Sequence, residues 1–278
     1  KARNSNSPLV ESNKIDPAFS GQSFSRKYLE EDFDGGFRID YVKDAQGKPM
    51  QYTVNQTMMR IELPNVLKYE EKISFSIKWW YNINNYTIDG GRSGYEHFEK
   101  DGNNLYVIAQ FYPRMAVYSD VEGWQNMQFW GSGEFALPFG NFEVNITVPA
   151  DHILEATGTL LNRNEVFTAE QLKKYKLAEQ SFDKPVIVVT QAEAEAREKG
   201  FSSEKKTWKF KAENVRDFGI STSRKFIYDA MAVKTGNTTA MAISLYPKEG
   251  NPLWEEYSTR IVAHTLKSYS SYTFDYPY

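Results

Sequence analysis

The stretch KISFSIKWWY, residues Lys72–Tyr81, carries the clearest structural pattern in the chain. Apolar side chains occupy every second position, and Ser or Lys stands between them as far as Trp79. A period of two places alternate side chains on opposite faces of a β-strand. One apolar face and one mostly polar face are typical of a strand in an antiparallel sheet. Trp80 breaks the pattern, because it adds a large ring to the polar face.

The same alternation predicts strands along most of the chain. It is clean at 142–148 and at 206–213. The other segments expected to form strands are 37–42, 52–63, 104–112, 152–161, 215–221 and 238–246. The turn Gly47-Lys48-Pro49 predicts a hairpin between the first two of these six. The fold class is therefore predicted to be mainly β, built from antiparallel sheets.

Two short helices are expected within 162–200. Thr168 with Gln171, and Thr190 with Glu193, have the spacing of a capping box, in which each side chain bonds the backbone N–H of the other residue. The charged pair of helices looks like an insertion between strands.

A longer amphipathic helix is expected near the end of the chain. Asn251 followed by Pro252 predicts an N-cap and a first helical position. Apolar residues then recur at spacings of three and four to roughly Tyr272. A helix with an apolar stripe and no following element indicates either a fragment or a chain that pairs with another chain.

Composition excludes several classes of protein. Of the 278 residues, 41% are hydrophobic and 25% charged, so the chain can bury a core and disorder is excluded as its main state. The net charge of −3 provides no positive field for a phosphate backbone, and we expect no nucleic-acid partner. No run of about 18 apolar residues is present, and we expect no transmembrane segment. Cysteine is absent, which excludes disulfides, thiolate metal ligands and cysteine nucleophiles.

Familiar catalytic motifs are also missing from the sequence. The three histidines, His97, His152 and His264, lie far apart, and no His-Glu-x-x-His occurs. Neither a Gly-x-Ser-x-Gly elbow nor a phosphate-binding P-loop is present. We therefore expect no metal ligand and no catalytic residue in this chain.

Aromatic residues offer a different kind of candidate site. They make up 15% of the chain and cluster at 79–86 and at 124–130. Such rings could form a stacking platform for sugars, or they could fill the core of a sheet. Most of the strand rings keep the buried period, which favours the core, and Trp80 is the exception.

Residues Ala109–Ala116, AQFYPRMA, resemble a known family. Zinc aminopeptidases of the aminopeptidase N type carry a Gln-Phe-x-Pro-x-x-Ala segment at the end of a strand in an N-terminal β domain. Asn141–Pro149 looks like the next strand of that domain, and Trp208–Phe218 is similar to its closing strand. Phe274–Tyr278 resembles the Phe-x-x-Pro-Tyr that follows the first helix of the family's peptidase domain. The four matches keep the family's order across most of 70–278, and the whole sequence resembles Bacteroidetes members.

The resemblance implies a domain organisation. After a polar tail at 1–19, residues 20–233 would form the family's saddle-like antiparallel β domain, here with a helical insertion. Residues 234–278 would be the first strand and helix of a thermolysin-like α/β peptidase domain, truncated before the zinc motif. In this gluzincin family, zinc is bound by His-Glu-x-x-His and a distant Glu, which would lie beyond Tyr278. The resemblance thus implies zinc in the intact enzyme, no cofactor in this chain, and the missing C-terminal peptidase domain as a partner.

The resemblance also implies substrate-binding residues. The residue that matches Gln110 helps to hold the N-terminal ammonium of the peptide substrate in the family. An amide oxygen can accept a charge-assisted hydrogen bond from an ammonium. The family's usual Arg pair and Pro-Cys-x-Asp stretch are absent after the motif, so this loop is rebuilt. Tyr118, Trp124 and Trp130 are candidate walls of a new pocket.

Two functions from different classes follow. The first is the substrate-capping portion of a zinc-dependent aminopeptidase, which is inactive as this chain alone. The alternative is a secreted β-rich module that binds glycan or protein through exposed aromatic rings. A periplasmic or secreted bacterial location is expected for either function.

Overall fold

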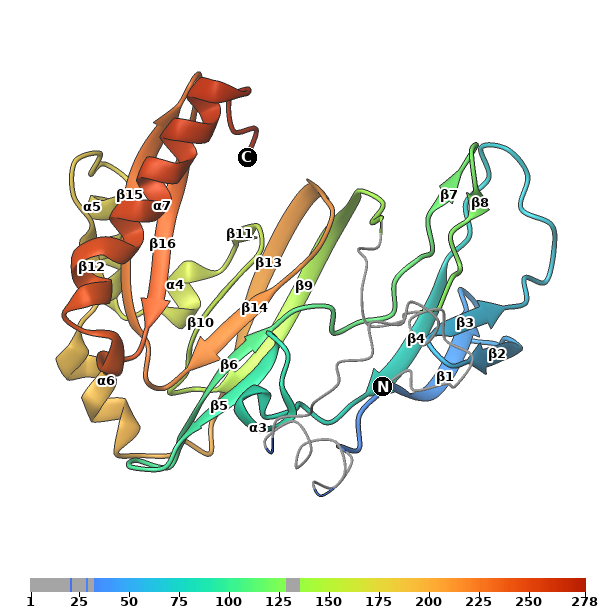
Figure 1. The fold of residues 1–278 in the computed structure, drawn as a ribbon, viewed down its shortest axis with the longest axis horizontal. Helices are drawn as coiled ribbons and strands as arrows, with labels where there is room; N and C mark the ends of the chain where they lie inside the picture. The colour runs from blue at the N-terminus through green and yellow to red at the C-terminus, as the bar shows by residue number, and fades with distance from the viewer. Residues whose placement is uncertain (1–20, 22–28, 30–32, 129–135) are drawn as a thin grey trace. The chain divides into compact units, whose positions relative to one another are not determined.

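The computed structural model describes residues 21, 29, 33–128 and 136–278. The chain divides into two compact units. The smaller unit comprises 1–84 and 114–138, and the larger unit comprises 85–113 and 139–278. The sheets are small and antiparallel, and the described fold is mainly β, as the sequence predicts (Figure 1). No helix in the described residues is long and apolar enough to cross a membrane.

The described part of the smaller unit contains three two-stranded sheets. They pair β1 (Arg38–Asp44) with β4 (Phe75–Trp80), β2 (Tyr52–Asn55) with β3 (Met58–Ile61), and β7 (Tyr118–Ser119) with β8 (Gly123–Trp124). The alternation predicted for β4 is confirmed, because its burial switches at every residue and Trp80 is exposed.

One expected pairing in the smaller unit is wrong. The segment 52–63 does not pair as one strand with 37–42, because Gln56 adopts a positive φ of 53° and turns the chain back on itself. The result is the separate hairpin β2–β3, and β1 pairs with β4 instead.

The larger unit contains three antiparallel sheets. In spatial order they are β10-β14-β6-β5, β11-β13-β9 and β12-β15-β16. The bounds of these strands are β5 Gly94–Phe98, β6 Asn103–Ile108, β9 Gly140–Pro149, β10 Ile153–Ala156, β11 Thr159–Leu160, β12 Val186–Val189, β13 Lys205–Val215, β14 Ile220–Ser223, β15 Ile227–Thr235 and β16 Thr238–Tyr246. Residues from all three sheets join one apolar core.

Short helices lie between the strands of the larger unit. They are α3 (Tyr86–Asp89), α4 (Arg163–Val166), α5 (Ala169–Ala178), α6 (Gln191–Glu198) and the 3-10 turn η1 (Lys248–Gly250). Both predicted capping boxes are present, at the N-termini of α5 and α6.

The sequence pattern does not reveal β12 and β15. Eight of the nine residues of β15 are buried, so its side chains show no alternation. The strand lies between β12 and β16, and helices contact it as well. A strand covered on both faces has no polar period to detect.

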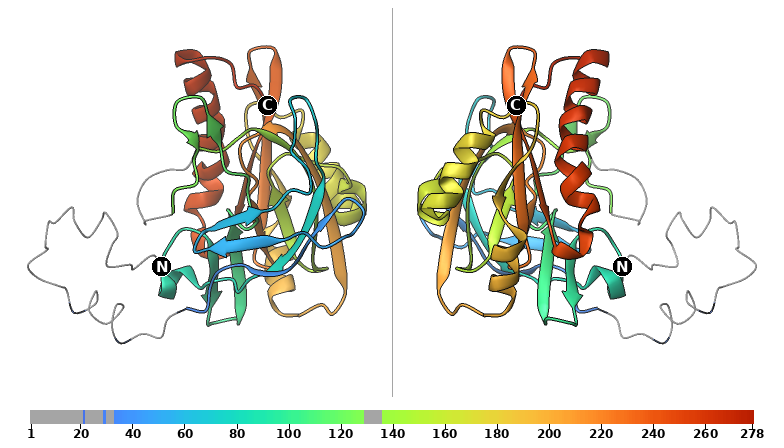
Figure 2. Two further views of the ribbon diagram at one scale, coloured as in Figure 1. Left: turned by 90° about the vertical axis from the view of Figure 1, so that its right-hand side faces the viewer. Right: turned by 90° about the vertical axis from the view of Figure 1, so that its left-hand side faces the viewer.

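The long helix α7 (Leu253–Tyr272) is confirmed and runs alongside β15 and β16 (Figures 1 and 2). Its N-cap is Pro252 rather than the expected Asn251. Ala263 packs against Met231 and Val233 of β15. The expected domain boundary between 233 and 234 falls inside β15, and that division stays a prediction.

Gly158 lies close against the backbone of β13. Its φ is +92°, and an added Cβ would lie 2.4 Å from the carbonyl oxygen of Lys211. Gly158→Ala is expected to lower the free energy of unfolding by about 1–3 kcal/mol, because it adds both a clash and backbone strain. Denaturant unfolding measures this effect. Gly200→Ala is the control, because nothing lies within 4 Å of its added Cβ. Equal stability of the two variants would contradict the expectation.

Candidate functional site

Gln110 lies two residues beyond the end of β6 and is exposed. Its φ of 54° is in the left-handed region, which a residue with a side chain rarely adopts. On one side, the Ser93 hydroxyl accepts a bond from the Ala109 N–H at 3.0 Å and donates one to the Ala109 carbonyl at 3.3 Å. This pair of hydrogen bonds fixes the chain immediately before Gln110.

Residues Phe111 and Tyr112 fix the chain on the other side of Gln110. Both rings pack against the core of the larger unit. The Tyr112 hydroxyl donates to Asp217 Oδ1 at 3.0 Å, and the same oxygen accepts the N–H of Phe218 at 2.8 Å. Such strain persists only where the surroundings enforce it. The backbone of Gln110 is thus fixed by contacts of the residues before and after it, and its side chain is exposed.

Tyr118 and Trp124 form a cross-strand pair in the smaller unit. Their ring centroids lie 5.2 Å apart at 71°, an edge-to-face contact. Both side chains are exposed. Trp130, the third candidate, lies outside the described residues. Gln110 belongs to the larger unit, and the single site predicted for these residues stays a prediction.

The histidines lie in three different settings. His97 Nδ1 contacts Asn104 Oδ1 at 2.7 Å, and His264 is exposed on α7. His152 is buried, and burial lowers its pKa to about 4. These surroundings do not resemble a shared metal site.

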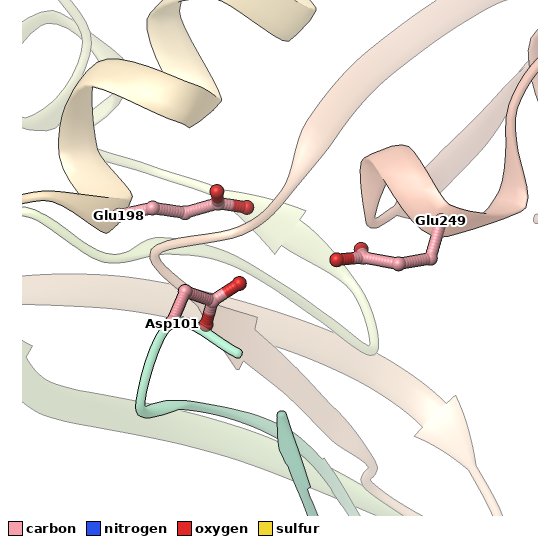
Figure 3. A group of neighbouring side chains, drawn as sticks. All are labelled: Asp101, Glu198 and Glu249. Carbon is pink, nitrogen blue, oxygen red and sulfur yellow. The ribbon is translucent and has the colours of Figure 1, made fainter. Parts of the chain in front are cut away.

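Three carboxylates of the larger unit do converge, as Figure 3 shows. They belong to Asp101 in the β5–β6 turn, to Glu198 at the end of α6 and to Glu249 in η1. One oxygen from each lies within 4.8 Å of the others. Within the described chain, no other group of this kind meets the geometry of a cation site.

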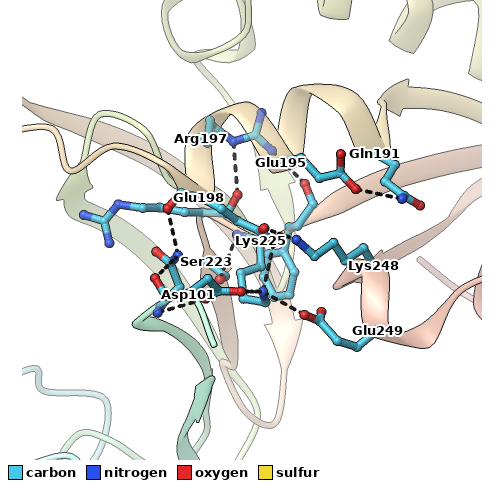
Figure 4. A network of polar contacts seen from close by, with 12 residues as sticks. Asp101, Gln191, Glu195, Arg197, Glu198, Ser223, Lys225, Lys248 and Glu249 are labelled. Carbon is cyan, nitrogen blue, oxygen red and sulfur yellow. Dashed lines mark hydrogen bonds and ion pairs between the residues drawn. The ribbon is translucent and has the colours of Figure 1, made fainter. Parts of the chain in front are cut away.

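The centre of this group is occupied by the ammonium of Lys225 (Figure 4). Its Nζ lies 2.9 Å from Glu198 and 3.0 Å from Glu249, and it also pairs with Asp101. The side chain of Lys225 is fully buried, and its Nζ lies 4.5 Å from the centre of the Phe98 ring. We call these four charged residues the Lys225 cluster. The carboxylates therefore hold a cation that belongs to the chain itself.

The electrostatics of the cluster agree with this geometry. Burial alone would lower the pKa of Lys225, but the hydrogen bonds that its ammonium donates to the three carboxylates outweigh this effect, and the pKa is raised. Burial would raise the pKa of Asp101, whereas its bonds from Lys225 and Asn103 lower it. Both shifts favour the charged forms. The cluster is a set of satisfied ion pairs rather than a site with spare ligands.

A second carboxyl with a shifted pKa lies on β10, where Glu155 is half-buried. Burial raises the pKa of Glu155 to about 7, although the nearby Arg163 and the hydroxyl of Tyr228 lower it in part. That hydroxyl donates to Glu155 Oε2 at 3.1 Å. Glu155 is therefore partly protonated near neutral pH.

No sequence motif points to Glu155 or to the Lys225 cluster. The four members of the cluster come from four separate parts of the chain and share no motif. Glu155 is one acid in a strand, and only the fold determines its burial. The family resemblance points to Gln110. Its left-handed backbone and the hydrogen bond between Ala109 and Ser93 are visible only in the structure.

No protein-family model and no curated protein match the chain. Crystal structures of an M1 zinc metallopeptidase from Deinococcus radiodurans are similar to it. A mutant of that enzyme matches with a TM-score of 0.49 and 15% identity, over 87% of this chain and 44% of that one. The structure without the mutation matches with a TM-score of 0.48 and 14% identity, over 87% and 44%. A mutant bound to a Tyr-Ser-Ala substrate matches with a TM-score of 0.47 and 15% identity, over 87% and 45%. The chain spans less than half of these structures, so its function has to be argued from its own residues.

Removing the buried ammonium tests the Lys225 cluster. Lys225→Met removes the ammonium that Asp101, Glu198 and Glu249 share, and Lys248 then pairs with Glu198 alone. The free energy of unfolding should fall by about 3–5 kcal/mol. Lys184→Met, at an exposed lysine, should change it by less than about 0.5 kcal/mol. Denaturant unfolding measures both. Adding Glu198→Gln to Lys225→Met should restore part of the loss, and similar stability of the two single variants would refute the role given to Lys225.

Glu155 should make stability depend on pH. Its pKa in the folded chain is about 7, above the usual 4.5, so the folded state holds the proton more tightly. Its contribution to stability is complete below pH 4.5 and is lost as the pH rises through 7. The loss is about 3 kcal/mol. Glu155→Gln should remove this pH dependence. The free energy of unfolding of the variant should therefore rise relative to that of the wild type between pH 4 and pH 8. Parallel pH profiles of unfolding would contradict this.

Proposed function

We propose that this chain is the substrate-capping portion of a zinc-dependent aminopeptidase, in which Gln110 accepts a hydrogen bond from the N-terminal ammonium of a peptide. One observation carries the proposal. The motif that resembles the family's amine-binding segment ends a strand, and the backbone of Gln110 is held there in a left-handed conformation. Its anchored neighbours leave the amide directed away from the core. Among the described residues, no hydrogen bond occupies that side chain.

The chemistry of the amide suits this role. Its oxygen is an acceptor, and an ammonium has three N–H donors and no acceptor. A hydrogen bond to a charged donor is stronger than one between neutral groups. An N-acylated peptide lacks the charge, and its N–H belongs to an amide. Gln110 would therefore favour a free N-terminus, which is the property that separates an exopeptidase from an endopeptidase.

Zinc does not fit the residues of this chain that the structure describes. Among the described residues, the one cluster with suitable spacing is made of oxygen ligands alone, and Lys225 already fills it. Zinc sites are usually built from nitrogen and sulfur ligands. In the proposal, the zinc ligands belong to a peptidase domain outside this chain. Saddle shape, capping by the β domain and a periplasmic or secreted location are parts of the same proposal.

The alternative function also has an observation in its favour. Trp80 and Trp124 are both exposed in the smaller unit, as a module that binds through aromatic rings requires. The guanidinium of Arg38 lies 5.2 Å from the Trp80 ring centre, which reduces the surface open to a sugar on that ring. Tyr118 contacts Trp124 edge to face, so this pair does not form a flat platform. We therefore rank the glycan-binding module second.

Peptides with and without a free amine test Gln110. The wild-type chain should bind leucine amide more tightly than N-acetyl-leucine amide, and the Gln110 side-chain NMR signals should shift. The preference should be about tenfold, because one hydrogen bond to a charged group contributes about 1.5 kcal/mol at the lower end of its range. Gln110→Ala should abolish the preference, and Gln110→Glu should keep it because a carboxylate is also an acceptor.

Gln180→Ala is the matched control, because Gln180 is likewise exposed in the larger unit. It should leave the preference unchanged. Equal binding of the two ligands by the wild-type chain would refute the role of Gln110. The codons that follow Tyr278 give a separate test, since the proposal expects a His-Glu-x-x-His there.

A further inference from the structure

The β7–β8 hairpin of the smaller unit exposes an unusual amount of apolar surface. From Met115 to Met127, five large apolar side chains are between 59% and 87% exposed; they are Met115, Tyr118, Val121, Trp124 and Met127. Single exposed apolar residues are ordinary, whereas several together mark a binding surface. We call these five residues the hairpin patch.

Hydrogen bonds hold the hairpin in one conformation although the side chains of its patch are exposed. Gln125 N–H donates to the carbonyl of Val117 at 2.8 Å, and Glu122 N–H donates to Ser119 Oγ at 3.1 Å. Gly123 supplies the positive φ of 69° that the turn requires. A surface that is already ordered loses little entropy when a ligand binds.

A further set of bonds ties the base of the hairpin to the β2–β3 turn. Gln128 Oε1 accepts bonds from the N–H and the hydroxyl of Thr57, at 2.9 and 2.6 Å. Gln128 Nε2 donates to the carbonyl of Asn55 at 2.9 Å. The hairpin therefore projects from a hydrogen-bonded support within the same unit.

The negative charge of the hairpin indicates a positively charged partner. Between Met115 and Gln128 the sequence contains two acids, Asp120 and Glu122, and no Lys, Arg or His. Both acids are exposed and flank Val121 at the tip. The faces of aromatic rings also attract cations. An apolar partner with positive charge would match both the patch and its acidic tip.

We propose that the hairpin patch is a docking surface for peptides that carry apolar side chains next to basic ones. Apolar side chains pack on the Tyr118–Trp124 pair and on the flanking methionines, whose flexible thioethers adapt to different shapes. Lys or Arg of the peptide pairs with Asp120 and Glu122. This goes beyond the amine recognition proposed for Gln110, because it needs no free N-terminus.

Other partners fit the surface less well. The acidic tip would be repelled by anionic lipid headgroups, which attract basic segments. The two rings meet at 71°, which gives a sugar no continuous face on which to stack. An acidic apolar peptide would bring like charges together. Each of these partners is an arm of the test.

The test uses the whole 278-residue chain and three N-acetylated, C-amidated tetrapeptides, with affinities measured by calorimetry. Leu-Arg-Phe-Lys should bind most tightly. Leu-Glu-Phe-Asp should bind at least tenfold more weakly because of its charge, and Ser-Arg-Ser-Lys because it lacks apolar groups. Acetylation removes the free amine, so the result is independent of Gln110. If these peptides do not bind, the proposed aminopeptidase function is unaffected. If Gln110 does not recognise a free amine, the proposal for the hairpin patch is unaffected.

Variants assign the binding to the hairpin. Trp124→Ala should weaken binding of Leu-Arg-Phe-Lys about tenfold, whereas Trp254→Ala, at a half-exposed tryptophan of α7, should not change it. Asp120→Asn with Glu122→Gln keeps the shape of the hairpin and should remove most of the salt dependence of binding. No binding of Leu-Arg-Phe-Lys, equal binding of the acidic peptide, or binding instead to phosphatidylserine vesicles or to a soluble polysaccharide would overturn the proposal.

Discussion

One buried ammonium organises the larger unit. The Lys225 cluster joins four separate parts of the chain, which are the β5–β6 turn, the end of α6, the β14–β15 turn and η1. Lys248 adds a second cation to the other oxygen of Glu198. Buried charge is tolerated only when it is paired. The strand order, the position of α6 and the entry to α7 must therefore be correct together before any of these charges is satisfied.

Much of the local structure could be predicted from the sequence, because local patterns determine it. The alternation of β4 and the capping boxes at Thr168 and Thr190 depend on neighbours within a few residues. The strand β15 could not be predicted in this way, because burial on both faces removes its period. The pairing of β1 with β4 was also missed, since a local turn suggested a nearer partner.

The candidate sites also differ in whether local sequence or the overall fold determines them. The motif at Gln110 is contiguous, so a family resemblance could point to it. The conformation that presents its amide depends on the bonds of Ser93 to Ala109 and on the bond of Tyr112 to Asp217, and neither Ser93 nor Asp217 is part of the motif. The acids that surround Lys225 are ordinary surface-type residues in the sequence, and their convergence is a property of topology alone. Spacing along a chain identifies chemistry only when the ligands are close together in that chain.

The tryptophans give the two units different optical properties. Trp208, in the larger unit, is fully buried, and within the described structure its indole N–H has no hydrogen-bond partner. Its emission should lie at short wavelength, because no water relaxes around the excited ring. Trp80 and Trp124, in the smaller unit, face solvent and should emit further to the red. Trp254 of the larger unit is half-exposed, so the emission of Trp208 at short wavelength is the signal that reports on the core of the larger unit, without any added label.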